Sequence, residues 1–496
     1  MLIETCPRDF QRVLALLFER SEHGVAGVLI GIRTGTRYNS EPMYPVGRVS
    51  WRDGRPNSRN MSTPTKKSFL SVKLRSLLPA LFLLTYPSAT LLIHGAGSAF
   101  SIAAAVISLA LLASPKAWTG LPSIHWDRVD IALCVATAWP VVAVLIGGAW
   151  HGAVVASTLD SPSRFFAATP LVLVLRRCLP RTLAWTDLSF ALAALTSLGI
   201  LLIAPRDWGF GRLSSQFLNP IHFGDIALAL GALSVLSLNL WRKDRLFVRI
   251  IKVGGLFAGL CASLMTGSRG GWVAIPVLAA MILYVRSRSK SRRWKVLLPL
   301  AIVAILAGTY VFSPTARDRV DDVSSDVVKY THGEKDTPLG IRLQLYEAAA
   351  RIVESHPLLG LGGDGFRDSM QSFANSGILT PAAAQLGRGE AHNQMFAYMT
   401  DYGIVGGLAL LAIYVVPGAI FWRRLSAPVS TSRRAALMGL TFVAAFWIFG
   451  LTVETFDLKM TVSFYATVIA ILIAIATYAE TRVGSEVARA ARDSRQ

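Results

Sequence analysis

Long apolar runs separated by short polar loops dominate the chain after residue 72. A helix that crosses a bilayer needs roughly 20 mostly apolar residues, and this pattern predicts an all-α polytopic membrane protein with about twelve transmembrane helices. The predicted spans are 74–94, 97–114, 130–150, 161–176, 183–204, 222–241, 248–267, 271–286, 295–312, 393–421, 435–451 and 460–479.

One polar interruption, residues 313–391, is far longer than the other loops and ends in the sequence GEAHNQ at Gly389–Gln394. Its first part, 313–337, is polar, and we expect it to be partly mobile. Apolar residues then recur at helical spacing from Ile341 to Val353, which predicts an amphipathic helix beginning at Gly340.

The rest of this interruption carries breakers and a second helical stretch. Pro357 and the glycines of GLGGDG at Gly360–Gly365 predict a tight turn. A second short helix is expected over Phe366–Asn375. The interruption therefore has the pattern of a folded, partly helical segment that covers the membrane spans.

These patterns divide the chain into five parts. They are a cytoplasmic N-terminal segment (1–72), spans 1–9 (73–312), an outer loop domain (313–391), spans 10–12 (392–480) and a cytoplasmic tail (481–496). Residues 1–60 are predicted to be disordered or an extension that precedes a natural start at Met61.

Composition agrees with a membrane protein, and charge orients it. Of the 496 residues 53% are hydrophobic and only 16% are charged, with a mean hydropathy of +0.47 and a net charge of +20. Short loops on one side carry twenty Lys and Arg residues, against five on the other. Positive charge marks the cytoplasmic side, so both termini are predicted to be cytoplasmic. The excess charge then serves orientation and anionic membrane lipids, and no nucleic-acid partner is expected.

Neither the cysteines nor the acidic residues predict a metal or a disulfide framework. The four cysteines lack metal-ligand spacing, as do Asp321, Asp322 and Asp364. We expect no metal and no cofactor.

Four arginines on the outer side are not explained by orientation: Arg164, Arg212, Arg269 and Arg342. Charged groups at membrane depth are costly and usually face a polar cavity or a partner. Guanidinium groups suit bidentate phosphate binding, so together these four predict a site for an anion such as a pyrophosphate. The alternative is that each one reaches lipid headgroups or pairs with one carboxylate.

The candidate base is His392, at the start of span 10. A neutral imidazole accepts a proton near pH 7, and Glu390 is placed to orient it. The alternative is a histidine that caps the helix, a task that Asn393 would serve equally well. His222, close to Arg212, is predicted to contact substrate or to cap span 6.

Four segments in order resemble the O-antigen ligase family within its polymerase–ligase superfamily: GRLSSQFLNPIHFGD, TGSRGGW, GIRLQLYEAAARIVESHPLLGLGGDGF and GEAHNQMFAYMTDYGIVG. The resemblance covers residues 73–480. It implies a GT-C-type glycosyltransferase of the bacterial inner membrane, with its active site and the 313–391 domain facing the periplasm. It also implies transfer of the O-antigen glycan from undecaprenyl pyrophosphate to lipid A–core oligosaccharide.

The same resemblance implies roles for the candidate residues. His392 is the family histidine and base, and Arg164, Arg212, Arg269 and Arg342 match the family arginines that bind pyrophosphate. Asn393, Glu390 and His222 are expected to contact substrate. The displacement would be inverting and independent of metal.

Three other functions compete with the ligase. An O-antigen polymerase would use a second lipid-linked glycan as acceptor, and a protein O-oligosaccharyltransferase would use a protein. A twelve-span transporter would have the same topology, but the chain lacks an evident internal repeat and its candidate polar groups gather on one side.

Overall fold

The computed structural model describes residues 66–114, 126–152, 154–178, 180–209, 211–287, 300, 314–387 and 390–493, and α-helices form most of their regular structure. The helices before the long outer segment are α3 (Lys66–Leu92), α4 (Ala96–Ala113), α5 (Arg128–Trp150), α6 (Ala156–Ser163), η2 (Arg164–Ala167), α7 (Ala168–Leu175), α8 (Pro180–Leu183), α9 (Thr186–Ile203), α10 (Pro220–Leu236), α11 (Leu246–Met265), η3 (Gly270–Ala274) and α12 (Ile275–Ser287). Strands β1 (Arg206–Asp207) and β2 (Leu213–Ser214) form one antiparallel pair.

The remaining helices include those of the outer segment and the last three spans. They are α14 (Pro314–Thr331), α15 (Pro338–Ser355), α16 (Gly365–Asn375), α17 (Pro381–Gly387), α18 (Gln394–Arg424), α19 (Ser430–Phe449) and α20 (Lys459–Asp493). Helix α20 thus continues past the predicted end of span 12 at residue 479.

Seven helices in the described part of the chain are long and apolar enough to cross a membrane. They are 96–113, 128–150, 180–203, 246–265, 394–424, 430–449 and 459–478, and three shorter apolar helices cover 77–92, 220–236 and 270–282. The prediction of an all-α polytopic membrane protein is confirmed by these helices. Predicted span 9 (295–312) and the N-terminal segment 1–60 lie outside the described residues, apart from residue 300.

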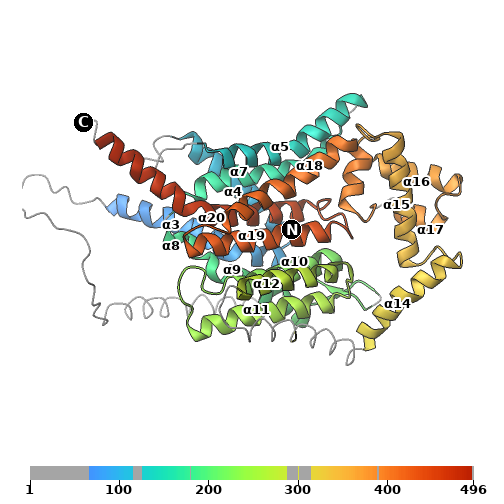
Figure 1. The fold of residues 1–496 in the computed structure, drawn as a ribbon, viewed down its shortest axis with the longest axis horizontal. Coiled ribbons are helices and arrows are strands. Elements are labelled where there is room, and N and C mark those ends of the chain that lie inside the picture. The colour runs from blue at the N-terminus through green and yellow to red at the C-terminus, as the bar shows by residue number, and fades with distance from the viewer. Residues whose placement is uncertain are drawn as a thin grey trace, which may run out of the picture. The chain divides into compact units, whose positions relative to one another are not determined.

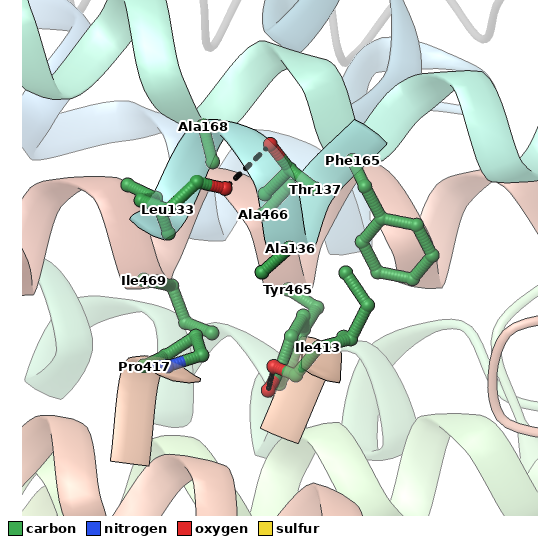
Figure 2. Close-up of a pocket in the computed structure, with 10 residues that line it drawn as sticks. All are labelled: Leu133, Ala136, Thr137, Phe165, Ala168, Ile413, Pro417, Tyr465, Ala466 and Ile469. Atoms are coloured by element: carbon green, nitrogen blue, oxygen red, sulfur yellow. Dashed lines mark hydrogen bonds between the residues drawn. The ribbon is translucent and has the colours of Figure 1, made fainter. Parts of the chain in front are cut away.

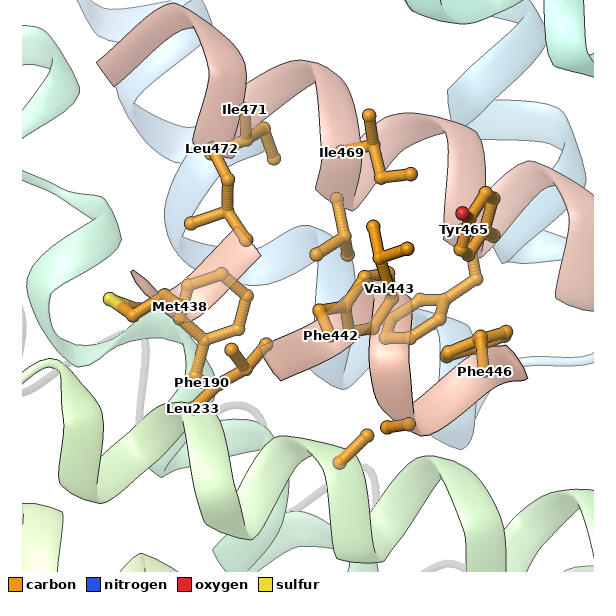
Figure 3. Packing of buried hydrophobic residues seen from close by; sticks show 14 of the residues in the cluster. Phe190, Leu233, Met438, Phe442, Val443, Phe446, Tyr465, Ile469, Ile471 and Leu472 are labelled. Carbon is orange, nitrogen blue, oxygen red and sulfur yellow. The ribbon is translucent and has the colours of Figure 1, made fainter. Parts of the chain in front are cut away.

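The apolar core lies where the last two helices meet α9 and α10. In the most apolar stretch of α20, 94% of the residues are buried. In the corresponding stretch of α4, only 22% are buried. Figure 3 shows Phe442 and Phe446 of α19 packed against Tyr465 and Ile469 of α20. The peripheral helices expose large apolar side chains such as Leu81 and Val106, as expected of surfaces that face lipid tails.

Two buried cations of the bundle, Lys252 and Arg176, are paired with carboxylates. The Lys252 Nζ atom, on a side chain with 0% exposure, lies 2.8 Å from Asp187 Oδ1 and 3.2 Å from Asp244 Oδ2. The Arg176 Nη1 atom lies 2.6 Å from Asp130 Oδ1. Burying a charge without such a partner is very costly. Lys252 and Arg176, which were counted among the twenty basic loop residues that orient the chain, therefore also have a structural role inside the bundle.

A small apolar cavity lies inside the bundle between α5, η2, α7, α18 and α20 (Figure 2). Pro417 lines it, and because proline has no N–H it leaves the carbonyl of Ile413 without its usual helical partner. The Tyr465 hydroxyl donates to that carbonyl at 3.0 Å. Beside the cavity, the backbone carbonyl that Pro417 leaves free in α18 is therefore satisfied by α20.

The outer segment folds into helices beside the start of α18, as Figure 1 shows for α15 and α16. Helix α15 buries the predicted stripe, including Leu345 and Ala348, against α16 and α17. Helix α16 and the turn at Gly360–Gly365 also confirm the predictions. Helices α14 and α17 were not predicted, because α14 is polar and α17 has only 7 residues.

Helix α18 is broken near its start, at Gly403. This residue has φ +59° and ψ −151°, a conformation open essentially only to glycine. The loop that follows α15 enters the break: Leu361 N–H donates to Thr400 O at 2.9 Å, and Ile404 N–H donates to Pro357 O at 2.8 Å. The outer domain is therefore hydrogen-bonded into the helix that begins just after His392.

We predict that Gly403→Ala destabilises the protein by about 3 kcal/mol. A Cβ atom at this position would lie 2.2 Å from the Leu358 carbonyl carbon, in addition to the backbone strain. Gly418→Ala on the same helix is the matched control. Its Cβ would meet only Val443 Cγ1, at 3.8 Å, and alanine is favoured over glycine in a helix by about 0.5–1 kcal/mol. Thermal unfolding in detergent would measure both, and equal melting temperatures would contradict the prediction.

Candidate active site around His392

The loop between α19 and α20, with the first residue of α20, connects the candidate site to the bundle. We call residues 450–459 the junction segment. Its Gly450 carbonyl accepts from Gln394 N–H at 2.7 Å, and its Phe456 N–H donates to Gln394 Oε1 at 2.5 Å. Its Phe456 carbonyl also accepts from the Ser161 hydroxyl at 2.6 Å. The start of α18 and the end of α6 are therefore held by one loop.

His392 has a strained backbone, with φ +55°. A residue with a Cβ atom in this left-handed region costs about 1–2 kcal/mol. The residues on both sides hold the conformation. Ala391 N–H donates to the Glu454 carboxylate, and the Asn393 side chain caps α18 by accepting from Met395 N–H at 2.9 Å. Strain of this kind persists where the surrounding structure over-determines it, and it gathers at functional sites.

The His392 side chain is 19% exposed and lies beside Glu390. Its Nδ1 atom is 3.7 Å from Glu390 Oε2, which is too far for a hydrogen bond. Among the described residues that Nδ1 atom has no hydrogen-bond partner. The contact becomes a charge pair when the imidazole takes up a proton, so it favours the imidazolium more than the neutral ring.

Burial and a neighbouring cation keep His392 neutral. Desolvation, together with the charge of Arg342, lowers the pKa of His392 to about 4. Desolvation raises the pKa of Glu390, which the Arg342 charge opposes. A neutral imidazole at pH 7 is the form that accepts a proton, so the predicted chemistry of a base fits this environment.

Arg342 and Tyr346 lie one turn apart on α15, next to His392. The Tyr346 hydroxyl lies 3.2 Å from the His392 carbonyl and 3.2 Å from the Leu451 carbonyl, to which it donates. Arg342 is partly exposed, and within the described ranges its charge acts on Tyr346, Glu390 and His392 without a direct ion pair. Arg342 is therefore a cation beside the base that can still accept an anion.

The turn with Arg269 and the loop with Arg212 lie side by side at the junction segment. A Cβ added to Gly267 would lie 3.5 Å from Arg212 Cγ, and one added to Gly270 would lie 2.6 Å from Thr452 Oγ1. Both arginines are partly buried. The packing therefore brings these two segments to the loop that also holds His392.

Arg164 is already paired with a carboxylate. Its Nη2 atom lies 2.7 Å from Asp160 Oδ1, and Asp160 also binds Lys459. The two cations hold the pKa of Asp160 below its ordinary value. The Nη1 atom of Arg164 is buried and has no hydrogen-bond partner in the described part of the chain. For Arg164, the alternative of a single carboxylate partner therefore describes most of its contacts.

His222 is buried in the first turn of α10, at 4% exposure. It does not cap the helix, because Asn219 caps α10 by accepting from Ile221 N–H at 2.8 Å. Its Nδ1 atom has no hydrogen-bond partner among the residues that the structure describes. Asn393 likewise acts as the cap of α18.

Glu454 is the member of this cluster that sequence reasoning missed. It lies in the junction segment and accepts the N–H of Ala391, directly before His392. The signal was present, since Glu454 and Asp457 are two carboxylates in a short loop between apolar runs, and carboxylates are costly near a membrane. The residues that these two carboxylates contact are decided by the packing of α19 and α20 against α18.

A model of the O-antigen ligase family matches residues 254–411, a range that includes Arg269, Arg342 and His392. This stretch is therefore similar to the O-antigen ligase family. A protein of Escherichia coli K12 named O-antigen ligase is 23% identical over 152 residues, which is 30% of this chain and 36% of that protein. An uncharacterized protein of Haemophilus influenzae is 24% identical over 302 residues, or 60% of this chain and 74% of that protein.

The match to the O-antigen ligase family model, together with the apolar helices, supports a membrane enzyme of the ligase or polymerase type. Such enzymes act on lipid-linked glycans in general. The family match begins at residue 254, inside α11, so Arg164, Arg212 and His222 lie outside it.

Proposed function

We propose that this protein is an O-antigen ligase with a GT-C-type fold of about twelve spans in the bacterial inner membrane. It would transfer the O-antigen glycan from undecaprenyl pyrophosphate to lipid A–core oligosaccharide at the periplasmic face, with both termini in the cytoplasm. The observation that carries this proposal is His392, strained and neutral, between Arg342 and Glu390 in the part of the chain that the O-antigen ligase family matches.

His392 is the general base in this proposal. It takes the proton of the acceptor hydroxyl as that oxygen attacks the anomeric carbon of the donor sugar. The bond from that carbon to the pyrophosphate breaks in the same step, so the configuration inverts. The imidazolium that forms lies beside Glu390, whose carboxylate stabilises it across the 3.7 Å contact.

The arginines stabilise the leaving pyrophosphate. Its negative charge grows as the sugar departs, and fixed guanidinium groups stabilise that charge without a metal. Arg342 lies next to the base, and Arg212 and Arg269 lie on neighbouring segments. We expect a smaller contribution from Arg164 because Asp160 already neutralises it. His222 remains a candidate contact to the donor through its Nδ1 atom.

The acceptor separates this function from its rivals. Purified protein supplied with lipid-linked O-antigen is expected to modify lipid A–core in preference to a second lipid-linked glycan or a pilin. Gel analysis and mass spectrometry of each product would measure transfer. Elongation of the lipid-linked glycan would instead indicate a polymerase, and a glycosylated pilin would indicate a protein O-oligosaccharyltransferase. No product with any acceptor would favour a transporter.

A further inference from the structure

Glu454 makes two contacts with the segment that carries His392. Its carboxyl group accepts the Ala391 N–H, and its backbone lies close enough to the Glu390 carboxylate to lower the pKa of that group. The two glutamates therefore hold the chain on the N-terminal side of His392. The Gln394 contacts with Gly450 and Phe456 hold the other side.

These contacts oppose the strain at His392. The left-handed conformation with φ +55° costs about 1–2 kcal/mol for a residue other than glycine. A hydrogen bond from a backbone N–H to a neutral carboxyl oxygen contributes about 0.5–1.5 kcal/mol, which is comparable with this strain. Loss of the Glu454 contact would let the Ala391–His392 peptide relax to an ordinary conformation, which moves the imidazole away from Glu390.

Glu390 and Glu454 also influence each other as a pair of acids. Desolvation raises the pKa of Glu454 well above its ordinary value, and the neighbouring carboxylates Glu390, Asp457 and Asp401 raise it further. The N–H of Ala391 acts in the opposite direction. Two carboxyl groups that share a partly buried site do not both ionise readily.

Local contacts decide which of the two keeps its proton. Arg342 and the Glu454 backbone both favour the charged form of Glu390, although Asp457 and desolvation oppose it. Arg342 is not among the groups that shift Glu454. The charge therefore belongs on Glu390, beside His392, and the proton on Glu454.

We propose that Glu454, in its protonated form, is the positioning residue for His392: it fixes the left-handed conformation through the Ala391 N–H and leaves Glu390 as the carboxylate that faces the imidazole. This inference rests on the proposed function of His392 as base. Glu454 lies in the junction segment between α19 and α20, 62 residues after His392.

Two substitutions of Glu454 separate its contact from its charge. In Glu454→Gln the amide oxygen still accepts the Ala391 N–H and mimics the neutral acid, so transfer at pH 7 should stay close to wild type. In Glu454→Ala the contact is lost, and kcat should fall by about 10- to 100-fold with an unchanged KM for the donor. Glu347→Gln, a surface glutamate on α15 with 48% exposure, is the control and should behave as wild type.

The pH profile gives a second readout that a purely structural role would not change. In the wild type, activity should fall at alkaline pH, because Glu454 then loses its proton and two negative charges oppose each other. In Glu454→Gln this alkaline decline should disappear. A Gln variant as inactive as the Ala variant, or one with an unchanged alkaline decline, would overturn the proposal.

A measurement without substrate distinguishes failure of this inference from failure of the proposed function. Diethylpyrocarbonate modifies neutral histidine, and mass spectrometry would give the rate at His392. That rate should rise in Glu454→Ala and stay at the wild-type value in Glu454→Gln. If no glycan transfer is found but these rates differ as stated, the positioning holds and the ligase proposal fails. Equal rates in all three proteins would refute the positioning itself.

Discussion

Replacement of His392 by alanine is expected to reduce glycan transfer by about 10²- to 10⁴-fold, the usual contribution of a general base. The acceptor hydroxyl would have no group to take its proton, while the arginines would still bind the pyrophosphate. The loss should therefore appear in kcat, with the KM for the lipid-linked donor little changed. In-vitro transfer to lipid A–core, measured over a range of donor concentrations, would test this expectation.

A second substitution shows whether the imidazole or the backbone matters. Asparagine tolerates the left-handed conformation better than alanine does, so His392→Asn should keep the local fold and still lose transfer. His332→Ala is the control, since His332 is exposed and lies at the end of α14. Transfer near the wild-type level in either His392 variant would exclude this residue as the base.

Arg342→Gln is expected to have the second-largest effect. It removes a cation beside the base, so the developing charge on the pyrophosphate loses a stabilising group. Removing one such donor typically costs about 10²- to 10³-fold in kcat. Arg351→Gln is the control on the same helix, because Arg351 is 52% exposed and pairs with Glu347 on the surface.

The pH profile of Arg342→Gln should also shift, and its direction follows from the electrostatics. The Arg342 charge lowers the pKa of both His392 and Glu390. Without it, both groups take up protons at higher pH, so the decline of activity on the acid side should move to higher pH. An acid limb in the same place as in the wild type would show that Arg342 does not act on these groups.

Much of the fold followed from local pattern. The apolar runs located helices such as α5, α18 and α19, and the stripe from Ile341 to Val353 located α15, because spans and amphipathic helices follow directly from the period of apolar positions. The turn at Gly360–Gly365 followed from its glycines. The helix α14 consists mostly of charged and small polar residues, and it was missed.

The candidate site was only partly predictable. His392, Glu390 and Arg342 are close in the chain or were identified by their residue type, and they lie together. For Arg164, the alternative of a single carboxylate partner is the one that the structure shows, with Asp160 four residues away as that partner. Composition identifies a guanidinium but does not say whether a carboxylate already neutralises it.

By itself, the sequence determined that this is a helical membrane protein with a folded polar segment at 313–391 and a histidine just before the helix that follows it. Those features depend on residues that are neighbours along the chain, where helical period and transfer free energy act locally. Only the tertiary structure decided the strained conformation of His392, the break at Gly403 and the contact of Glu454 with Ala391. These depend on how α18, α19 and α20 pack, which brings together loops that lie far apart in the sequence.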